Sequence, residues 1–375
     1  MSIHNFKSFF LELRRRVFSG FILYLHNLFF ILKLYLRSNK KSKNTKLLIV
    51  HLQEFNQGRY GFQLINYLSL AGYDVTFYRS FKFLLFLKSY DRLIYKIPNI
   101  SIWKNLKRSN NTLTSYLFLK QDSSFKIKNR IENKFCLDLN YFKSFEQGNK
   151  SSIIMPFFIH PNMNKYYLID KPVKKNRILF YGSDNTIYNS DEINNKFNLL
   201  SRFEVFHCIQ QSEINFINPN NIDDLLDRLD NPTIRNEFFF IDSNKIWIPE
   251  EKWLNVLSSF DFFIATPGVI MPQSHNSIEA MLTETILITQ YAKWFSPSLV
   301  DKVNCLEYKN QNELFSVINF AMNLSDEEIS YLRRNSNHYF NNYIKPSSLV
   351  NRIEELKESS ITLVYNAEDY SVSEY

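Results

Sequence analysis

Residues 261–291 read DFFIATPGVIMPQSHNSIEAMLTETILITQY, and this stretch indicates how the surrounding chain folds. An apolar strand over 261–265 ends at a Pro-Gly pair, a helix follows over 274–283, and a second strand occupies 286–289. A strand, loop, helix and strand in this order are typical of a parallel α/β sheet. In such a sheet the helix begins beside the carboxyl end of the first strand, where open α/β sheets bind ligands.

The start of this helix is a candidate anion site. Ser274 is expected to cap it, and the free backbone N–H groups and positive dipole end of the first turn favour a diphosphate. His275 and Asn276 on the first turn can donate to phosphate oxygens. Glu279 lies one turn further on the same face, from where its carboxylate can accept from both hydroxyls of a ribose. Gly268 would allow close approach of the backbone to phosphate, or would only make a turn.

The alternation of strands and helices continues on both sides of this segment. The predicted elements of the C-terminal half are strands over 178–181 and 238–242 and helices over 249–259, 311–323, 325–340 and 346–358. The acidic tail 361–375 is expected to be loose.

The N-terminal half shows a weaker pattern of the same kind. A strand over 46–52, a Gly-containing loop, a helix over 60–71 and a strand over 74–78 form a βαβ unit. Such a unit requires a parallel sheet with a right-handed crossover. Further strands are predicted over 90–95 and 152–159.

The string PQSHNSIEAM at 272–281, preceded by the apolar strand and the Pro-Gly pair, resembles the donor-binding core of bacterial GT-B glycosyltransferases. The resemblance covers roughly 150–350. Weaker similarities follow along the chain, namely Met155-Pro156, His160-Pro161, ILFYG at 178–182, Ser201-Arg202 and NCLEY at 304–308.

The resemblance implies a fold and a set of binding residues. Glu279 would hold the donor ribose, and the Pro-Gly loop with Gly268 and Pro272 would face the diphosphate of a nucleotide-sugar. Gly182 would lie on the donor side. Arg202 would contact the diphosphate or act structurally.

The implied architecture is α/β, with two Rossmann-like domains facing across a cleft (GT-B) and an N-terminal membrane-associating helix. We expect a basic, apolar membrane-associating segment and linker over 1–45 and an acceptor-side domain over 46–168. A nucleotide-sugar-binding domain would cover 169–345, and a helix with an acidic tail 346–375.

Two positions depart from the family's pattern. Met271 stands where many retaining members carry a second Glu, and Leu282-Thr283-Glu284 stands where Gly is frequent. The stereochemistry of transfer, inverting or retaining, is therefore left open.

If transfer inverts the anomeric centre, a catalytic base is expected from the first domain. His51 at the end of the first strand and Glu54 in the following loop have suitable side chains, although many surface carboxylates would fit equally well. Arg59 is a candidate contact for acceptor or phosphate. His160 has a role in the cleft or simply ends a strand.

The sequence offers no motif for metal or cofactor chemistry. No Asp-x-Asp triplet is present, and the acidic run at 223–230 has the spacing of a solvated helix face. We therefore expect a metal-independent reaction without a cofactor, in which helix dipole and cationic side chains stabilise the leaving diphosphate. The P-loop, GxGxxG and Ser-His-Asp motifs are also absent.

The N-terminal segment suggests a membrane partner. Residues 1–46 contain ten lysines and arginines and one acidic residue, so they carry a net charge of +9, whereas the whole chain carries +8. The remainder is nearly neutral, which suits an anionic membrane surface better than nucleic acid.

The sixteen uncharged residues 17–32 are short for a span, about 24 Å against a hydrocarbon core of ~30 Å. A helix lying in the membrane interface is favoured over a single span or a helix buried on the protein. Three cysteines at unrelated spacings fit a reducing compartment.

Together these features predict a hexosyltransferase of GT-B type at the cytoplasmic face of the inner membrane, peripheral or single-span. It would transfer sugar from a nucleotide diphosphate-sugar to a saccharide or lipid-linked acceptor in polysaccharide or lipopolysaccharide biosynthesis. The alternatives are a nucleotide-sugar epimerase-like GT-B enzyme and a membrane-bound, non-catalytic scaffold with a relict donor site.

Overall fold

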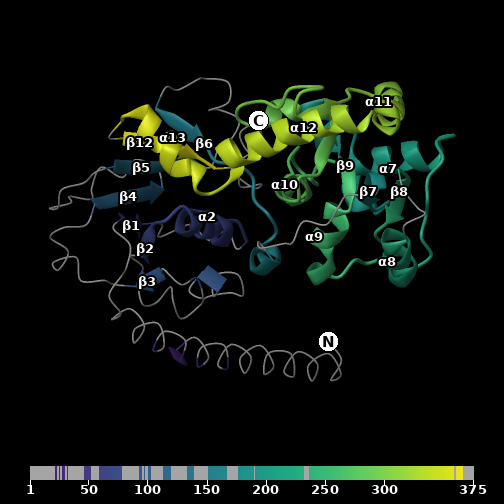
Figure 1. Ribbon diagram of the computed structural model, residues 1–375. Helices are drawn as coiled ribbons and strands as arrows, with labels where there is room; N and C mark the ends of the chain where they lie inside the picture. Colours follow the sequence, from purple (N-terminus) through teal and green to yellow (C-terminus); the bar gives the residue numbers. More distant parts are fainter. Residues whose placement is uncertain are drawn as a thin grey trace, which may run out of the picture. The chain divides into compact units, whose positions relative to one another are not determined.

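The computed structural model describes part of the chain in detail. The described residues are 22, 25, 28, 29, 32, 46–51, 59–77, 93, 94, 97, 100–102, 113–119, 133–138, 151–166, 176–189, 191–231, 236–358 and 360–365. The chain forms two compact units, which are described separately (Figure 1). The first unit comprises Met1–Asp138, Asn149–Ile153 and Val350–Leu363, and the second comprises Leu139–Gly148, Ile154–Leu349 and Val364–Tyr375.

The first unit is built on a seven-stranded sheet with the order β3-β2-β1-β4-β5-β12-β6. Its strands are β1 (Lys46–His51), β2 (Asp74–Phe77), β3 (Ile100–Ile102), β4 (Leu113–Leu119), β5 (Asn133–Asp138), β6 (Ser152–Ile154) and β12 (Ser360–Val364). The pairs from β3 to β5 are parallel. Helix α2 (Arg59–Leu70) connects β1 to β2, which confirms the βαβ unit.

Three predictions in the first unit are corrected. Leu93 and Ile94 are helical, so the strand predicted over 90–95 is wrong there. The strand predicted over 152–159 ends at Ile154, because Pro156 lacks the N–H that would continue the ladder. The tail predicted as loose begins with β12, whose residues 361–364 are β-branched or apolar and mostly buried.

The second unit is built on a five-stranded sheet with the order β11-β10-β9-β7-β8, and all its pairs are parallel. The strands are β7 (Asn176–Gly182), β8 (Phe238–Asp242), β9 (Phe260–Ala265), β10 (Ile286–Thr289) and β11 (Cys305–Glu307). The four strands predicted over 178–181, 238–242, 261–265 and 286–289 are confirmed.

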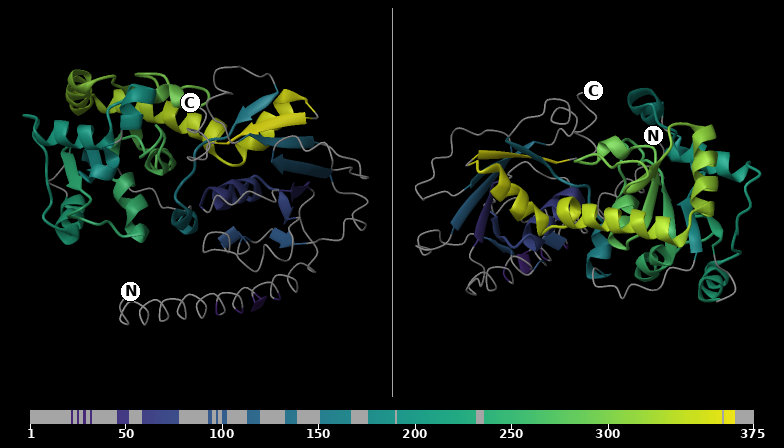
Figure 2. Two further views of the ribbon diagram at one scale, coloured as in Figure 1. Left: turned by 180° about the vertical axis from the view of Figure 1, so that it is seen from behind. Right: turned by 45° about the horizontal axis from the view of Figure 1, so that its top comes forward.

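Helices connect these strands. They are α6 (Asp191–Phe197), α7 (Arg202–Gln210), α8 (Ile222–Asp230), α9 (Glu250–Ser258), α10 (His275–Leu282), α11 (Gln311–Asn323) and α12 (Asp326–Tyr339). Helix α13 (Ser348–Leu356) follows and lies mostly in the first unit. Figure 1 shows α9 and α10 to one side of β9 and β7 and α7 to the other, and Figure 2 shows α12 (yellow-green) along the outside of the second unit.

Both faces of the second sheet are buried. On one face, alternate strand residues such as Phe180, Phe240 and Ile264 form a core with α7, α11 and α12. On the other face, Phe263 packs edge-on against Trp253 of α9, with ring centroids 6.2 Å apart. Burial on both faces explains why these strands are continuous apolar runs rather than alternating ones.

The strand order creates a switch point beside β7. From β7 the chain runs through α6, α7 and α8 to β8 on one side, and it then returns through α9 to β9 on the other side. Because the connections leave β7 and β9 in opposite directions, a crevice is expected outside their carboxyl ends. Any ligand of this unit is expected there.

Five residues of the N-terminal segment are described. Ile22, Leu25, Leu28, Phe29 and Leu32 are helical, and all except Leu28 are exposed hydrophobic side chains. No helix in the part of the chain that the structure describes has both the length and the apolar character needed to cross a bilayer.

Candidate functional site

A hollow of about 220 Å³ opens in the second unit where its topology predicts a ligand. It is lined by His160, Met163, Tyr181, Ile248, Glu250, Trp253, His275, Asn276 and Glu279. Tyr181 lies at the end of β7, and α9 and α10 start with Glu250 and His275. The hollow therefore lies at the carboxyl edge of the sheet, beside the first turns of two helices.

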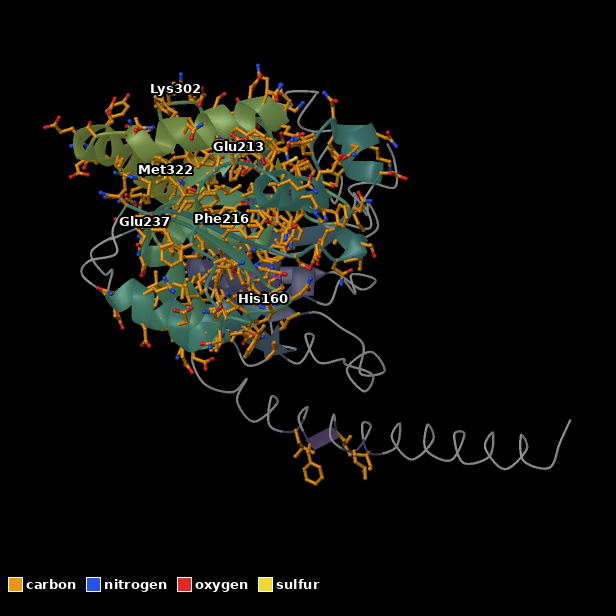
Figure 3. All side chains as sticks on the ribbon, turned by 90° about the vertical axis from the view of Figure 1, so that its right-hand side faces the viewer. His160, Glu213, Phe216, Glu237, Lys302 and Met322 are labelled. Atoms are coloured by element: carbon orange, nitrogen blue, oxygen red, sulfur yellow. The ribbon has the colours of Figure 1, made fainter. Side chains whose placement is uncertain are left out.

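The view in Figure 3 places this hollow relative to the opposite edge of the sheet. His160 lies apart from Glu237 and Lys302 in this view. Glu237 and Lys302 precede β8 and β11, so they mark the amino edge. The separation agrees with a site at the carboxyl edge.

The first turn of α10 carries no side-chain cap. Ser274 occupies the N-cap position, but its hydroxyl donates weakly to the carbonyl of Thr266 at 3.4 Å instead of bonding within the helix. Among the described residues, no hydrogen bond occupies the backbone N–H groups of His275 and Asn276. This turn can therefore offer its amides and the positive end of its dipole to an anion.

Glu279 is the most heavily hydrogen-bonded side chain of the site. Its Oε1 accepts the backbone N–H of His160 at 2.7 Å and lies 3.2 Å from Nδ1 of His275. Its Oε2 accepts the indole N–H of Trp253 at 2.6 Å. The side chain is 0% exposed, so it lies in the wall of the hollow beneath the surface. The predicted ribose contact requires a hydroxyl to share an oxygen with these donors or to displace one, and it stays a prediction.

Two opposing effects act on the charge of Glu279. Burial raises the pKa of this carboxyl, but the positive charge of His275 and hydrogen bonds from His275, His160 and Trp253 together hold the pKa below its ordinary value. Glu279 is therefore ionised at neutral pH, and its negative charge fixes the surrounding donors.

The two histidines of the hollow are held in defined orientations. Because Glu279 is ionised, Nδ1 of His275 carries the hydrogen in their contact, which leaves Nε2 as the nitrogen that can meet a ligand. Nδ1 of His160 accepts weakly from the backbone N–H of Asn162 at 3.4 Å. The two rings lie 5.2 Å apart between centroids. Two imidazoles thus stand beside the first turn of α10.

The opposite wall is aromatic. The rings of Tyr181 and Trp253 lie with centroids 5.0 Å apart and are tilted by 43°. Burial raises the pKa of Tyr181, so its phenol stays neutral. The wall offers two aromatic rings and a largely apolar surface to a ligand.

Arg202 holds the Pro-Gly loop through its side chain. Its Nη2 donates to the carbonyl of Pro267 at 3.2 Å, and its guanidinium lies 4.2 Å from the ring centroid of Tyr188. Burial lowers the pKa of Arg202. Arg202 is not among the residues that line the hollow, and its contacts are those of a residue that shapes the loop.

Packing explains both glycines of the predicted set. A Cβ on Gly268 would meet the carbonyl oxygens of Met271 and Gln273 at 3.0 and 3.2 Å, so the loop requires its absence. A Cβ on Gly182 would meet the ring of Phe180 at 2.6 Å. Pro272 is buried in the same loop as Gly268.

The candidates of the first unit are placed only by their elements. His51 is the last residue of β1, and Arg59 is the first residue of α2. Glu54 lies outside the described residues. Their roles in catalysis and acceptor binding remain predictions.

The sequence pointed to the α10 side of the hollow but missed the rest of its wall. Met163, Tyr181, Ile248, Glu250 and Trp253 line it without having been predicted. A usable signal was present, because Tyr181 lies at the end of β7 and Ile248, Glu250 and Trp253 follow β8, so these four share the carboxyl edge of the sheet with α10.

No protein-family profile and no curated protein sequence matches the chain. Among solved structures it is similar to HepE from Anabaena in complex with UDP and glucose, at 10% identity and a TM-score of 0.39, over 83% of this chain and 99% of that one. Sucrose-phosphate synthase from Thermosynechococcus elongatus and a glycosyltransferase from Rickettsia africae each match at 11% identity and 0.39, over 84% of this chain and 98% of theirs. Similarities of this extent leave the chemistry of the site to be inferred from the chain's own residues.

Proposed function

We propose that the chain is a glycosyltransferase of GT-B type that uses a nucleotide diphosphate-sugar as donor. The observation that carries the proposal is the hollow at the switch point of the second sheet, bordered by the uncapped first turn of α10. Uncapped helix amides favour a diphosphate, and the aromatic wall favours a flat or ring-shaped group next to it. The sequence resemblance around 272–281 points to the same ligand.

In this proposal, an acceptor hydroxyl forms a bond to the anomeric carbon of the donor sugar while the bond to the diphosphate breaks. The leaving diphosphate gains negative charge, which the amides of α10, the side chain of Asn276 and the imidazolium form of His275 would stabilise. If the transfer inverts the anomeric centre, the hydroxyl proton would pass to a base of the first unit, with His51 and Glu54 as candidates. The groups named on the second unit need no metal ion for this stabilisation.

We further propose that the acceptor is a saccharide or lipid-linked saccharide at the cytoplasmic face of the inner membrane. The net charge of +9 on residues 1–46 and the exposed apolar side chains of Ile22, Leu25, Phe29 and Leu32 support a membrane-surface location. Enzymes of polysaccharide or lipopolysaccharide assembly work on such acceptors.

Thermal unfolding in the presence of UDP-, GDP- and ADP-sugars tests the donor. At least one of them is expected to raise the melting temperature of the wild type, because a ligand that binds only the folded state stabilises it. CMP-sugars, which carry a single phosphate, serve as the comparison. His275→Ala should weaken the shift, and His338→Ala on the exposed face of α12 should not. The proposal fails if no diphosphate-sugar shifts the wild type at millimolar concentration.

The products formed from the stabilising donor distinguish sugar transfer from the two alternatives, an epimerase-like reaction and a scaffold without activity. A transferase should release the nucleotide rapidly only when a membrane acceptor extract is added, and EDTA should leave the rate unchanged. An epimerase-like enzyme would convert the donor without acceptor, and a scaffold would convert nothing.

A further inference from the structure

Glu250 is a carboxylate in the wall of the hollow, separate from the groups proposed to stabilise the leaving diphosphate. It is the first residue of α9, directly after Pro249, and it is half-buried. Its neighbour Glu251 is exposed and does not line the hollow. Of these two adjacent acidic residues, only Glu250 therefore lines the hollow.

One oxygen of Glu250 is held and the other is open. The side-chain amide of Asn162 donates to Oε1 at 2.5 Å. Oε2 makes no hydrogen bond within the part of the chain that the structure describes. An ionised carboxylate only accepts hydrogen bonds, so the open oxygen calls for a donor from a ligand.

The surroundings of Glu250 favour a sugar ring as that donor. Trp253 follows it by three residues on α9 and contacts the ring of Tyr181, and Ile248 and Met163 complete an apolar wall. A sugar ring presents an apolar C–H face and a rim of hydroxyl donors, which match an aromatic wall beside a carboxylate. A phosphate group does not match, because two negative charges would be brought together.

Glu279 is less suited to the same task. Three donors already occupy its two oxygens and its side chain has no exposed surface, whereas Glu250 reaches the hollow with a free acceptor. Of the two carboxylates in the wall, Glu279 fixes the protein groups and Glu250 faces the ligand.

We propose that Glu250 accepts hydrogen bonds from hydroxyl groups of a bound sugar ring and thereby determines affinity for the donor. This inference rests on the proposed donor site. The hydroxyls belong either to the ribose of the nucleotide or to the transferred sugar, and both present the same chemistry to the carboxylate.

Binding constants of matched variants test the proposal. The wild type, Glu250→Gln and the control Glu251→Gln are titrated calorimetrically with UDP, GDP and ADP. The nucleotide that binds the wild type is then compared with its 2′,3′-dideoxy analogue and with its glucose conjugate. Glu250→Gln is expected to weaken binding about tenfold, as loss of a charge-assisted hydrogen bond should, and Glu251→Gln should bind like the wild type. If the melting temperature of Glu250→Gln lies well below that of Glu251→Gln, Glu250→Asp is titrated in its place. Its loss of affinity is expected to be smaller than the tenfold loss expected for Glu250→Gln.

Each outcome has a distinct meaning. If the wild type binds none of the nucleotides or their conjugates, the proposed function itself fails. A loss in Glu250→Gln that disappears with the dideoxy analogue supports contact with the ribose. A loss confined to the glucose conjugate supports contact with the transferred sugar. The inference alone is overturned if the wild type binds but Glu250→Gln matches Glu251→Gln, or if all ligands lose affinity equally.

Discussion

At the scale of single residues, Glu279 connects three parts of the second unit that are distant in sequence. It bonds to His275 on its own helix, to Trp253 at a separation of 26 residues and to the backbone of His160 at a separation of 119. A side chain in this position stabilises the site whether or not it touches a ligand. Its contribution can be measured through its charge.

Glu279→Gln is expected to destabilise the second unit by about 2 kcal/mol at neutral pH. The amide offers one acceptor where the carboxylate offers two, and its NH₂ group meets a donor. Because the folded pKa of Glu279 lies below its ordinary value near 4.5, its stabilising effect is fully present above pH 4.5 and is lost as the pH falls through the folded pKa.

Urea unfolding of wild type and Glu279→Gln between pH 3 and pH 7 checks this prediction. The difference in free energy of unfolding should be largest at pH 7 and should shrink below pH 4.5. A difference that stays constant with pH would mean that the charge of Glu279 contributes nothing.

At the scale of elements, the turn from α10 into β10 shows how the chain replaces a missing glycine. Glu284 takes the left-handed conformation there, with φ of 60°, and Thr285 N–H donates to the carbonyl of Ala280 at 2.8 Å. These features define a Schellman motif with Glu284 at the position that usually holds Gly. The side-chain amide of Asn337 donates to Glu284 at 3.0 Å. The turn therefore forms without Gly, at some conformational cost.

Comparison of two substitutions isolates that cost. Glu284→Gly and Glu284→Ala both lose the bond to Asn337, but only glycine adopts the left-handed conformation freely. Glu284→Gly is expected to be the more stable of the two by about 1 kcal/mol. Chemical denaturation of both variants measures the difference, and an alanine variant of equal or greater stability would contradict the left-handed turn.

Four strands of the second unit, β7 to β10, were predictable because each contains a continuous apolar run. Strands β4 (Leu113–Leu119) and β5 (Asn133–Asp138) were not predicted, because both lie in a polar, aromatic stretch without a clear apolar run. Strand β12 was not predicted, because its short apolar run lies next to an acidic tail. Its neighbours in the sheet are β5 and β6.

The candidate site was likewise predictable only in part. Local spacing indicated that His275, Asn276 and Glu279 share one end of a helix. It could not indicate that Trp253 and His160 occupy the oxygens of Glu279, because those contacts exist only after the sheet has formed. Nor could it indicate the aromatic wall, which comes from the ends of other strands.

At the scale of the whole molecule, the chain divides its charge unevenly. Residues 1–46 carry a net charge of +9 while the remainder is close to neutral. Four of the five described residues of this segment have exposed apolar side chains, and these four, Ile22, Leu25, Phe29 and Leu32, follow one another at intervals of three or four residues. Helical side chains at such intervals share a face. Basic charge and an exposed apolar face together suit an anionic membrane surface.

Deletion of residues 1–40 is therefore expected to move the protein from the membrane pellet to the soluble fraction. In the full chain, replacing Phe29 and Leu32 by Glu should have the same effect, because the apolar face would lose its affinity for the bilayer. Full-length protein should sediment with vesicles of anionic phosphatidylglycerol and much less with neutral phosphatidylcholine. Binding should weaken as salt screens the lysines and arginines. Retention of the deleted form in the pellet, or equal binding to both vesicles, would place the membrane contact elsewhere in the chain.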